Sequence, residues 1–177
     1  MRRKQLLVAG AAAALMLGAV LAPAPAYASD VLVCNGTSTV TFSPGIHYGS
    51  ETTTDIHAVT DYISCLGSAT ITSGESEQTF NDVPVSCDTI FPTESVAPVD
   101  WSNSTSSTLE LTGQVIFPQG LLEVIELSGT VSDGAYQGAD VTTLGVYAAT
   151  SLLGCSALNP NGLTSLSGTA TLTITPA

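Results

Sequence analysis

The sequence predicts an all-β fold: an antiparallel β-sandwich or a closed barrel of about eight to ten strands, held by two disulfides. Apolar and polar residues alternate along most of the chain, which is the period of a half-buried strand. Clusters of Gly, Pro, Asn and Asp separate the alternating segments, as turns do. The four cysteines form an even set, as in a disulfide framework. Between the two architectures the pattern slightly favours the sandwich.

The alternation defines the strands expected in the first half of the chain. They are Thr39–Ser43, residues 53–64, Ala69–Thr72, Glu77–Phe80 and Val83–Cys87. Pro44-Gly45 is expected to end the first of them. Pro84 indicates an edge strand, because proline cannot donate a ladder hydrogen bond. Residues 88–98, which contain two prolines, are expected to form a loop.

The clearest pattern lies in the second half of the chain. Thr105–Phe117 and Leu121–Ser132 each have a row of apolar residues on one face and mostly polar residues on the other. Pro118-Gln119-Gly120 between them is a turn, so the two segments predict a hairpin. Asp133-Gly134 marks the next turn. Two further strands are expected at Val141–Ala148 and Leu166–Ile174.

The cysteines are Cys34, Cys65, Cys87 and Cys155. Their spacings match no zinc motif and no C-x-x-C occurs, so structural disulfides are the favoured interpretation. Cys34–Cys65 would join the ends of an N-terminal hairpin, and Cys87–Cys155 would tie the late chain to its middle. These are the favoured pairs, although the spacing leaves all three possible connectivities open.

The first 28 residues have the pattern of an export signal. Arg2-Arg3-Lys4 precedes an apolar run from Leu6 to Leu21, and Ala26-Tyr27-Ala28 is an A-x-A cleavage site. We therefore expect residues 1–28 to be a signal peptide and the product to be secreted into the extracellular space. Subtracting 28 from 177 leaves 149 residues, so 29–177 is expected to be a single all-β domain.

The distribution of charge excludes several classes of function. All three Lys and Arg precede residue 5 and all fifteen Asp and Glu follow residue 29, so the mature chain has a formal charge of −15. It can have no Arg clamp for phosphate, no Schiff-base lysine and no basic groove for nucleic acid. Nucleic acid and, after signal cleavage, membrane are therefore not expected partners. A basic partner is favoured by long-range attraction.

No catalytic motif is present: the chain lacks G-x-S-x-G, H-E-x-x-H, S-x-x-K and the P-loop. Asp55, His57 and Asp61 share one face of the expected strand 53–64, and with His47 they could hold a divalent cation. A solvated polar face is the favoured interpretation of these side chains. The sequence therefore predicts no metal and no cofactor.

Two further candidates concern carbohydrate chemistry. Glu123 and Glu126 resemble a glycosidase pair, but residues three apart in a strand point to opposite faces and cannot act together locally. Trp101 stands before a probable turn at Ser102-Asn103-Ser104 and could present an exposed sugar-binding ring. A buried tryptophan is the favoured interpretation.

Several short stretches carry a resemblance to a known group of proteins. They are Thr39–Gly45, Trp101-Ser102-Asn103, Leu153-Gly154-Cys155, Thr164–Leu172 and the layout of the four cysteines. On these features the mature chain resembles small, exported, acidic all-β proteins of actinobacteria that have no assigned function. The resemblance implies export and an all-β fold, and it assigns no activity and no site residues.

Together these observations favour a secreted, non-catalytic binding or assembly protein that acts with an extracellular protein partner. A carrier of a small apolar ligand is the alternative, and a hydrolase built from distant residues ranks below both. Specific contact needs a surface with few carboxylates. The uncharged stretch Leu144–Leu153, which contains Tyr147 and has the composition of a helical turn, is one candidate. An unpaired strand edge is the other.

Overall fold

The computed structural model describes residues 30–90, 94–119, 122–148, 153–156 and 158–177, with the backbone alone for 114–119, 122 and 123. The predicted signal peptide lies outside these ranges. The described residues form eight β-strands and no α-helix. The strands are β1 (Leu32–Ile46), β2 (Thr52–Leu66), β3 (Gly74–Val85), β4 (Glu94–Trp101), β5 (Ser106–Gln119), β6 (Leu122–Gly134), β7 (Asp140–Ala148) and β8 (Leu163–Thr175).

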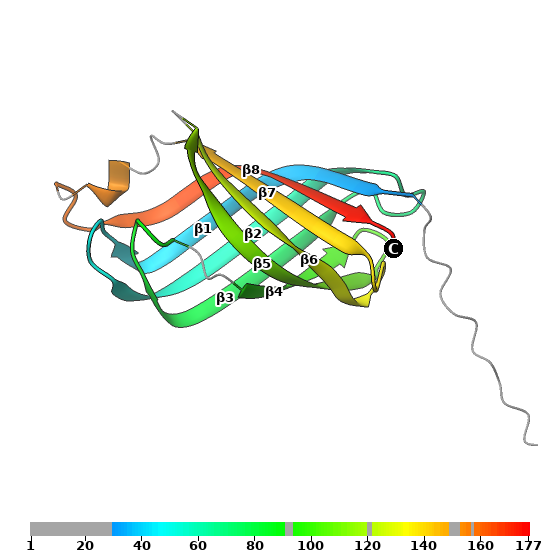
Figure 1. The fold of residues 1–177 in the computed structure, drawn as a ribbon, viewed down its shortest axis with the longest axis horizontal. Helices are drawn as coiled ribbons and strands as arrows, with labels where there is room; N and C mark the ends of the chain where they lie inside the picture. Colours follow the sequence, from blue (N-terminus) through cyan, green and yellow to red (C-terminus); the bar gives the residue numbers. More distant parts are fainter. Residues whose placement is uncertain (1–29, 91–93, 120–121, 149–152, 157) are drawn as a thin grey trace, which may run out of the picture.

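The eight strands close into one antiparallel barrel (Figure 1). Each strand pairs with the next in sequence, and β8 returns to pair with β1 from Leu32–Ile174 to Ile46–Leu163. The all-β class is confirmed, but the preference for a sandwich is wrong. The reason is that β1 has a long partner on both sides, so the sheet does not divide into two separate layers.

The first strand is longer than the sequence predicted. Pro44-Gly45 does not end it, because β1 continues to Ile46, which is fully buried and pairs with Leu163. The register between β1 and β8 shifts between Thr41 and Ile46. Such an irregularity accommodates a proline, since the residues within it need no regular ladder hydrogen bond.

Two further boundaries differ from the prediction. Ala69–Thr72 is a loop, in which the Thr72 carbonyl accepts a hydrogen bond from the Cys65 N–H at 2.9 Å. The two strands expected near Glu77–Phe80 and from Val83 onward are one strand, β3, and it ends at Val85. The loop expected over 88–98 contains the first five residues of β4.

The hairpin predicted from Thr105–Phe117 and Leu121–Ser132 is present as β5 and β6. Its ladder runs from Ser107–Gly134 to Gln119–Leu122. Its expected turn at Pro118-Gln119-Gly120 extends into residues that the structure does not describe. The two last predicted strands are confirmed as β7 and β8.

Closure of the barrel depends on glycines at crowded points of the wall. A Cβ placed on Gly36 would lie 1.8 Å from the Asp61 carbonyl oxygen, and one on Gly129 would lie 1.8 Å from that of Glu110. No other residue type allows two strands to approach so closely, and such glycines let a sheet bend enough to close.

Inward-facing side chains form two buried clusters, one toward each end of the barrel. At what we call the Trp101 end, the cluster includes Leu32, Tyr62, Trp101, Leu109, Val131, Leu172 and Ile174. At the opposite end, which we call the Cys87 end, it includes Val40, Phe42, Ile56, Cys87, Ile125, Leu163 and Leu166. The outward positions between these residues are mostly Thr, Ser, Asp and Glu.

Both predicted disulfides are formed, with the favoured connectivity. Cys34–Cys65 joins residues that face each other directly across β1 and β2, with a Cα–Cα distance of 4.0 Å. Cys87–Cys155 spans 6.1 Å between Cα atoms and ties the residues just after β3 to the turn at 153–156 before β8. One disulfide therefore reinforces the Trp101 end and the other the Cys87 end.

Candidate binding site between β3 and β4

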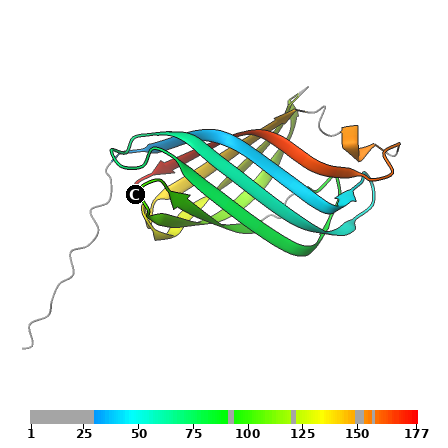
Figure 2. The ribbon, with the colours of Figure 1, turned by 180° about the vertical axis from the view of Figure 1, so that it is seen from behind.

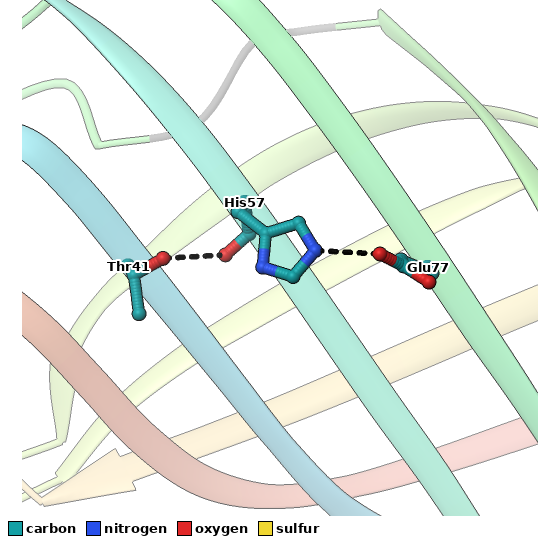
Figure 3. Close-up of polar contacts among 3 residues, drawn as sticks. All are labelled: Thr41, His57 and Glu77. Carbon is teal, nitrogen blue, oxygen red and sulfur yellow. Dashed lines mark hydrogen bonds and ion pairs between the residues drawn. The ribbon is translucent and has the colours of Figure 1, made fainter.

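His57, one of the residues suspected of metal binding, contacts Thr41 of β1 and Glu77 of β3 on the outer face of the barrel (Figure 3). His57 Nε2 lies 2.8 Å from Glu77 Oε1, and the Thr41 hydroxyl donates to the His57 carbonyl at 3.4 Å. Asp55 Oδ1 accepts a hydrogen bond from the backbone N–H of Asp82 at 3.0 Å. Within the described ranges no group of three or more His, Cys, Asp or Glu could hold a metal. The arrangement fits the solvated polar face.

The remaining acidic and histidine candidates are also dispersed. Asp61 is exposed on β2, and His47 lies in the turn after β1, where its carbonyl accepts from the Cys87 N–H at 3.0 Å. Glu126 is exposed on β6. The side chain of Glu123 is outside the described residues, so the structure does not place it relative to Glu126.

Trp101 is buried, as the sequence interpretation favoured, and is only 4% exposed. Its indole N–H donates to the Ser107 hydroxyl at 2.8 Å, and that hydroxyl donates to the Ala135 carbonyl at 2.6 Å. The ring lies against Gly74 of β3, where an added Cβ would come within 2.5 Å of it. Trp101 therefore fastens β3 and β4 together at one end and offers no exposed sugar platform.

The stretch Leu144–Leu153 does not provide the expected docking surface in its described part. Leu144–Ala148 belongs to β7 and is paired with β6 on one side, while β8 pairs with it as far as Tyr147. Tyr147 is buried, and its hydroxyl donates to the Ser38 hydroxyl at 3.2 Å inside the barrel. Residues 149–152 lie outside the described residues, and a short 3₁₀ turn begins at Leu153.

The unpaired strand edge, the other candidate, is found between β3 and β4. Within the described part of the chain these strands share only two residue pairs, Gly74–Trp101 and Glu75–Asp100. Beyond them, Ser76–Val85 is paired with β2 alone and Glu94–Val99 with β5 alone. Figure 2 shows β1, β2 and β3 side by side, so the free side of β3 is the one away from β2. We call this incomplete junction the seam.

Each strand that borders the seam contains a proline. Pro84 lies in β3 opposite Thr53 of β2, and Pro98 lies in β4 opposite Thr108 of β5. The edge character predicted from Pro84 is confirmed over this part of β3. Pro98 was assigned to a loop, but the same reasoning applies to it, because no described residue of β3 pairs opposite it. The two prolines are the sequence feature that could have located the seam.

A groove of about 790 Å³ begins at the seam and crosses the neighbouring strands. It is lined by Phe80, Glu94, Ser95, Val96, Glu110, Leu111, Thr112, Gly129 and Thr130. Phe80 is half-buried and Val96 is 60% exposed, so apolar surface is accessible here. The groove thus combines free backbone groups with an apolar floor.

The rim of the groove is acidic. Val96 pairs with Glu110 and Glu94 with Thr112, so the two carboxylates lie on the same outer face, with the Ser95–Leu111 pair between them. Since the chain has no Lys or Arg beyond residue 4, no fixed cation can neutralise them. The His57–Glu77 contact is the ion pair formed by the described residues. The groove therefore favours positively charged groups.

The barrel interior is uncharged at neutral pH in its described part. Burial, with a smaller contribution from Tyr147, raises the pKa of the Tyr62 hydroxyl well above its usual value. Tyr62 therefore stays protonated, and a ligand in the interior cavity would meet hydroxyl groups, the Gln78 side chain and hydrocarbon.

No protein-family model, no curated protein and no solved structure matches this chain. No helix in the described ranges is long and apolar enough to cross a membrane.

Proposed function

We propose that the mature domain is a secreted, non-catalytic binding protein that docks an extended, basic segment of an extracellular protein against the seam. The observation that carries the proposal is the two-pair ladder between β3 and β4. It leaves two strand edges whose backbone groups are available to a third strand. Strand addition to such an edge is a recurrent mode of protein recognition.

The side chains around the seam support a partner of defined chemistry. An added strand would alternate its side chains between the two faces of the wall. Outward side chains would lie beside Glu94, Glu110 and the exposed Val96. Lysine or arginine, whose long stems cover apolar surface while the charged ends reach carboxylates, suits this rim. A second copy of the chain suits it poorly, because both surfaces would be acidic.

Secretion is part of the same proposal. Two disulfides suit an oxidising compartment, and the N-terminal residues have the pattern of an export signal. Outward positions rich in Thr, Ser, Asp and Glu suit contact with water and favour neither nucleic acid nor a lipid surface as partner.

The test selects ten-residue peptides from a displayed random library against the immobilised mature domain and maps the bound peptides by amide NMR shifts. We expect peptides with alternating basic and apolar residues, and shifts concentrated in Ser76–Val85 and Glu94–Val99. Association should slow as salt rises beyond about 0.15 M, where the Debye length falls to about 8 Å.

Two variants decide whether the seam is responsible. Val96→Lys places a like charge at the rim and should weaken the selected peptides by at least about tenfold, a usual size for an unfavourable charge at a binding surface. Ile63→Lys is the matched control, since Ile63 is another exposed apolar residue, 72% exposed, on the outer face of β2. The proposal would be contradicted if both variants weakened peptide binding equally or if the amide NMR shifts fell outside the seam. Dimerisation of the domain through the seam would also contradict it.

A further inference from the structure

The barrel encloses a cavity of about 100 Å³ that is separate from the acidic outer rim. It is lined by Ser38, Val40, Ile56, Ala58, Thr60, Gln78, Phe80, Ser95, Ile125, Leu127, Gly145 and Tyr147. None of these side chains carries a charge at neutral pH. The cavity lies where the cluster at the Cys87 end adjoins that of the Trp101 end, and Leu127 packs against both.

The lining of the cavity includes hydroxyl groups with unused hydrogen-bonding capacity. The Ser38 oxygen accepts from the Thr60 hydroxyl at 3.1 Å and from the Tyr147 hydroxyl at 3.2 Å, so it is left with its own proton to donate. The Ser95 hydroxyl is buried and has no hydrogen-bond partner in the described part of the protein. Burying such a group without a partner is unfavourable.

Another part of the lining is hydrocarbon. Val40, Ile56 and Ile125 are all at most 5% exposed and belong to one buried cluster. Water would satisfy the serine hydroxyls but gain nothing from this wall. A molecule with one oxygen and a compact hydrocarbon body would hydrogen-bond to a serine hydroxyl and also pack against the hydrocarbon part of the lining.

The structure also provides an entrance. Phe80 and Ser95 line the cavity and the outer groove alike, so the two spaces adjoin at the seam. Only two residue pairs close the wall there. A small molecule could enter by displacing the Phe80 ring, without separating any other pair of strands.

We propose that this cavity is a binding site for a small, neutral molecule with a single carbonyl or hydroxyl oxygen. The oxygen accepts the proton of the Ser95 hydroxyl, which has no partner among the described residues, and the hydrocarbon packs on Val40, Ile56 and Ile125. A cavity of about 150 Å³ holds benzene, so a ligand of about five heavy atoms fits this one. The site does not depend on the protein-docking function of the seam.

Methyl NMR of the mature protein tests the proposal with two probes of the same shape. Butan-2-one has the required oxygen, and 2-methylbut-1-ene replaces that oxygen with a methylene group. We expect butan-2-one to shift the methyl signals of Val40, Ile56 and Ile125, and its affinity, unlike that of the hydrocarbon, to depend on the Ser95 hydroxyl.

Variants identify the groups responsible. Ser95→Ala should weaken butan-2-one about fivefold and leave 2-methylbut-1-ene unchanged. Ala58→Leu should fill the cavity and abolish binding of both probes. Thr79→Ala, on the outer face of β3, is the control and should change neither. The proposal is overturned if butan-2-one shifts none of the three methyl signals, if its binding is unaffected by Ser95→Ala, or if Ser95→Ala weakens both probes equally.

Discussion

The junction between β1 and β2 and the junction between β3 and β4 are built very differently, although both belong to one closed barrel. The first has eleven residue pairs and the Cys34–Cys65 disulfide. The second has two pairs within the described residues, Gly74–Trp101 and Glu75–Asp100. A barrel therefore closes when every pair of neighbouring strands is joined somewhere, and one junction can remain largely open.

The open junction shows how a free strand edge is kept from unspecific association. A long bare edge normally invites pairing with other chains, and proteins restrain it with proline and charge. Pro84 and Pro98 interrupt the two edges, and Glu94 and Glu110 surround them with negative charge that no Lys or Arg offsets. Under the proposed function, the same prolines and carboxylates would make the edge selective for a basic strand.

The disulfides should give the largest effects in this comparison. Changing Cys87 and Cys155 to alanine is expected to lower the free energy of unfolding by about 4 kcal/mol, as is changing Cys34 and Cys65, because each bridge restricts the unfolded chain. Urea unfolding measures both losses. Amide hydrogen exchange should distinguish the two variants. The amides of Ser76–Val85 should exchange faster only in the variant that lacks Cys87–Cys155, because that disulfide fixes the end of β3 that does not pair with β4.

The control is the first strand, whose amides are paired on both sides and should stay protected in both variants. If Ser76–Val85 exchanged equally in the two variants, or no faster than β1, the difference between the two junctions would have no energetic consequence.

Local pattern predicted the parts of the fold that one strand or one turn determines. The hairpin of β5 and β6, the strands β7 and β8 and the burial of Trp101 follow from alternation and residue type. The choice of barrel over sandwich does not, because it depends on β1 meeting β8 across more than a hundred residues. Pro98 misled for a related reason: it is tolerated in β4 only because β3 has no pair opposite it.

The candidate sites were less predictable than the fold. The expectation of an unpaired edge was general, and only Pro84 pointed to β3. Ser38, Thr60 and Ser95 come from three different strands and line the same cavity. Serine and threonine are common on both faces of these strands, so their identity does not reveal which of them lie inside.

A change at the paired end of the seam, where Gly74 lies opposite Trp101, should have an intermediate effect on stability. In Gly74→Ala the new Cβ would lie 2.5 Å from Cε3 of Trp101. We expect a loss of about 2 kcal/mol in the free energy of unfolding, since such crowding outweighs the small gain from a less flexible unfolded chain. Urea unfolding of Gly74→Ala, Trp101→Phe and the double variant measures it.

The double variant distinguishes crowding from a general loss of strand geometry. Phenylalanine is smaller than the indole and leaves room for the methyl group, so the double variant should lose less than the two single variants added together. Additive losses would show that Gly74 matters for another reason than contact with Trp101.

The smallest effect is expected on the fully paired side of the barrel. His57 Nε2 and Glu77 Oε1 form a hydrogen bond at 2.8 Å, which is an ion pair only when His57 is protonated. The side chains are 43% and 63% exposed, so water screens the attraction. His57→Gln should change the free energy of unfolding by no more than about 0.5 kcal/mol, since exposed pairs contribute little and glutamine can still donate a hydrogen bond. Urea unfolding of His57→Gln, Glu77→Gln and the double variant gives the coupling between the two side chains. A coupling above about 1.5 kcal/mol would mean that side-chain contacts contribute strongly to the stability of the junction between β2 and β3. A small coupling would mean that the backbone ladders of β2 with β1 and β3 are the main source of stability here. The seam has no ladder of that length in the described residues.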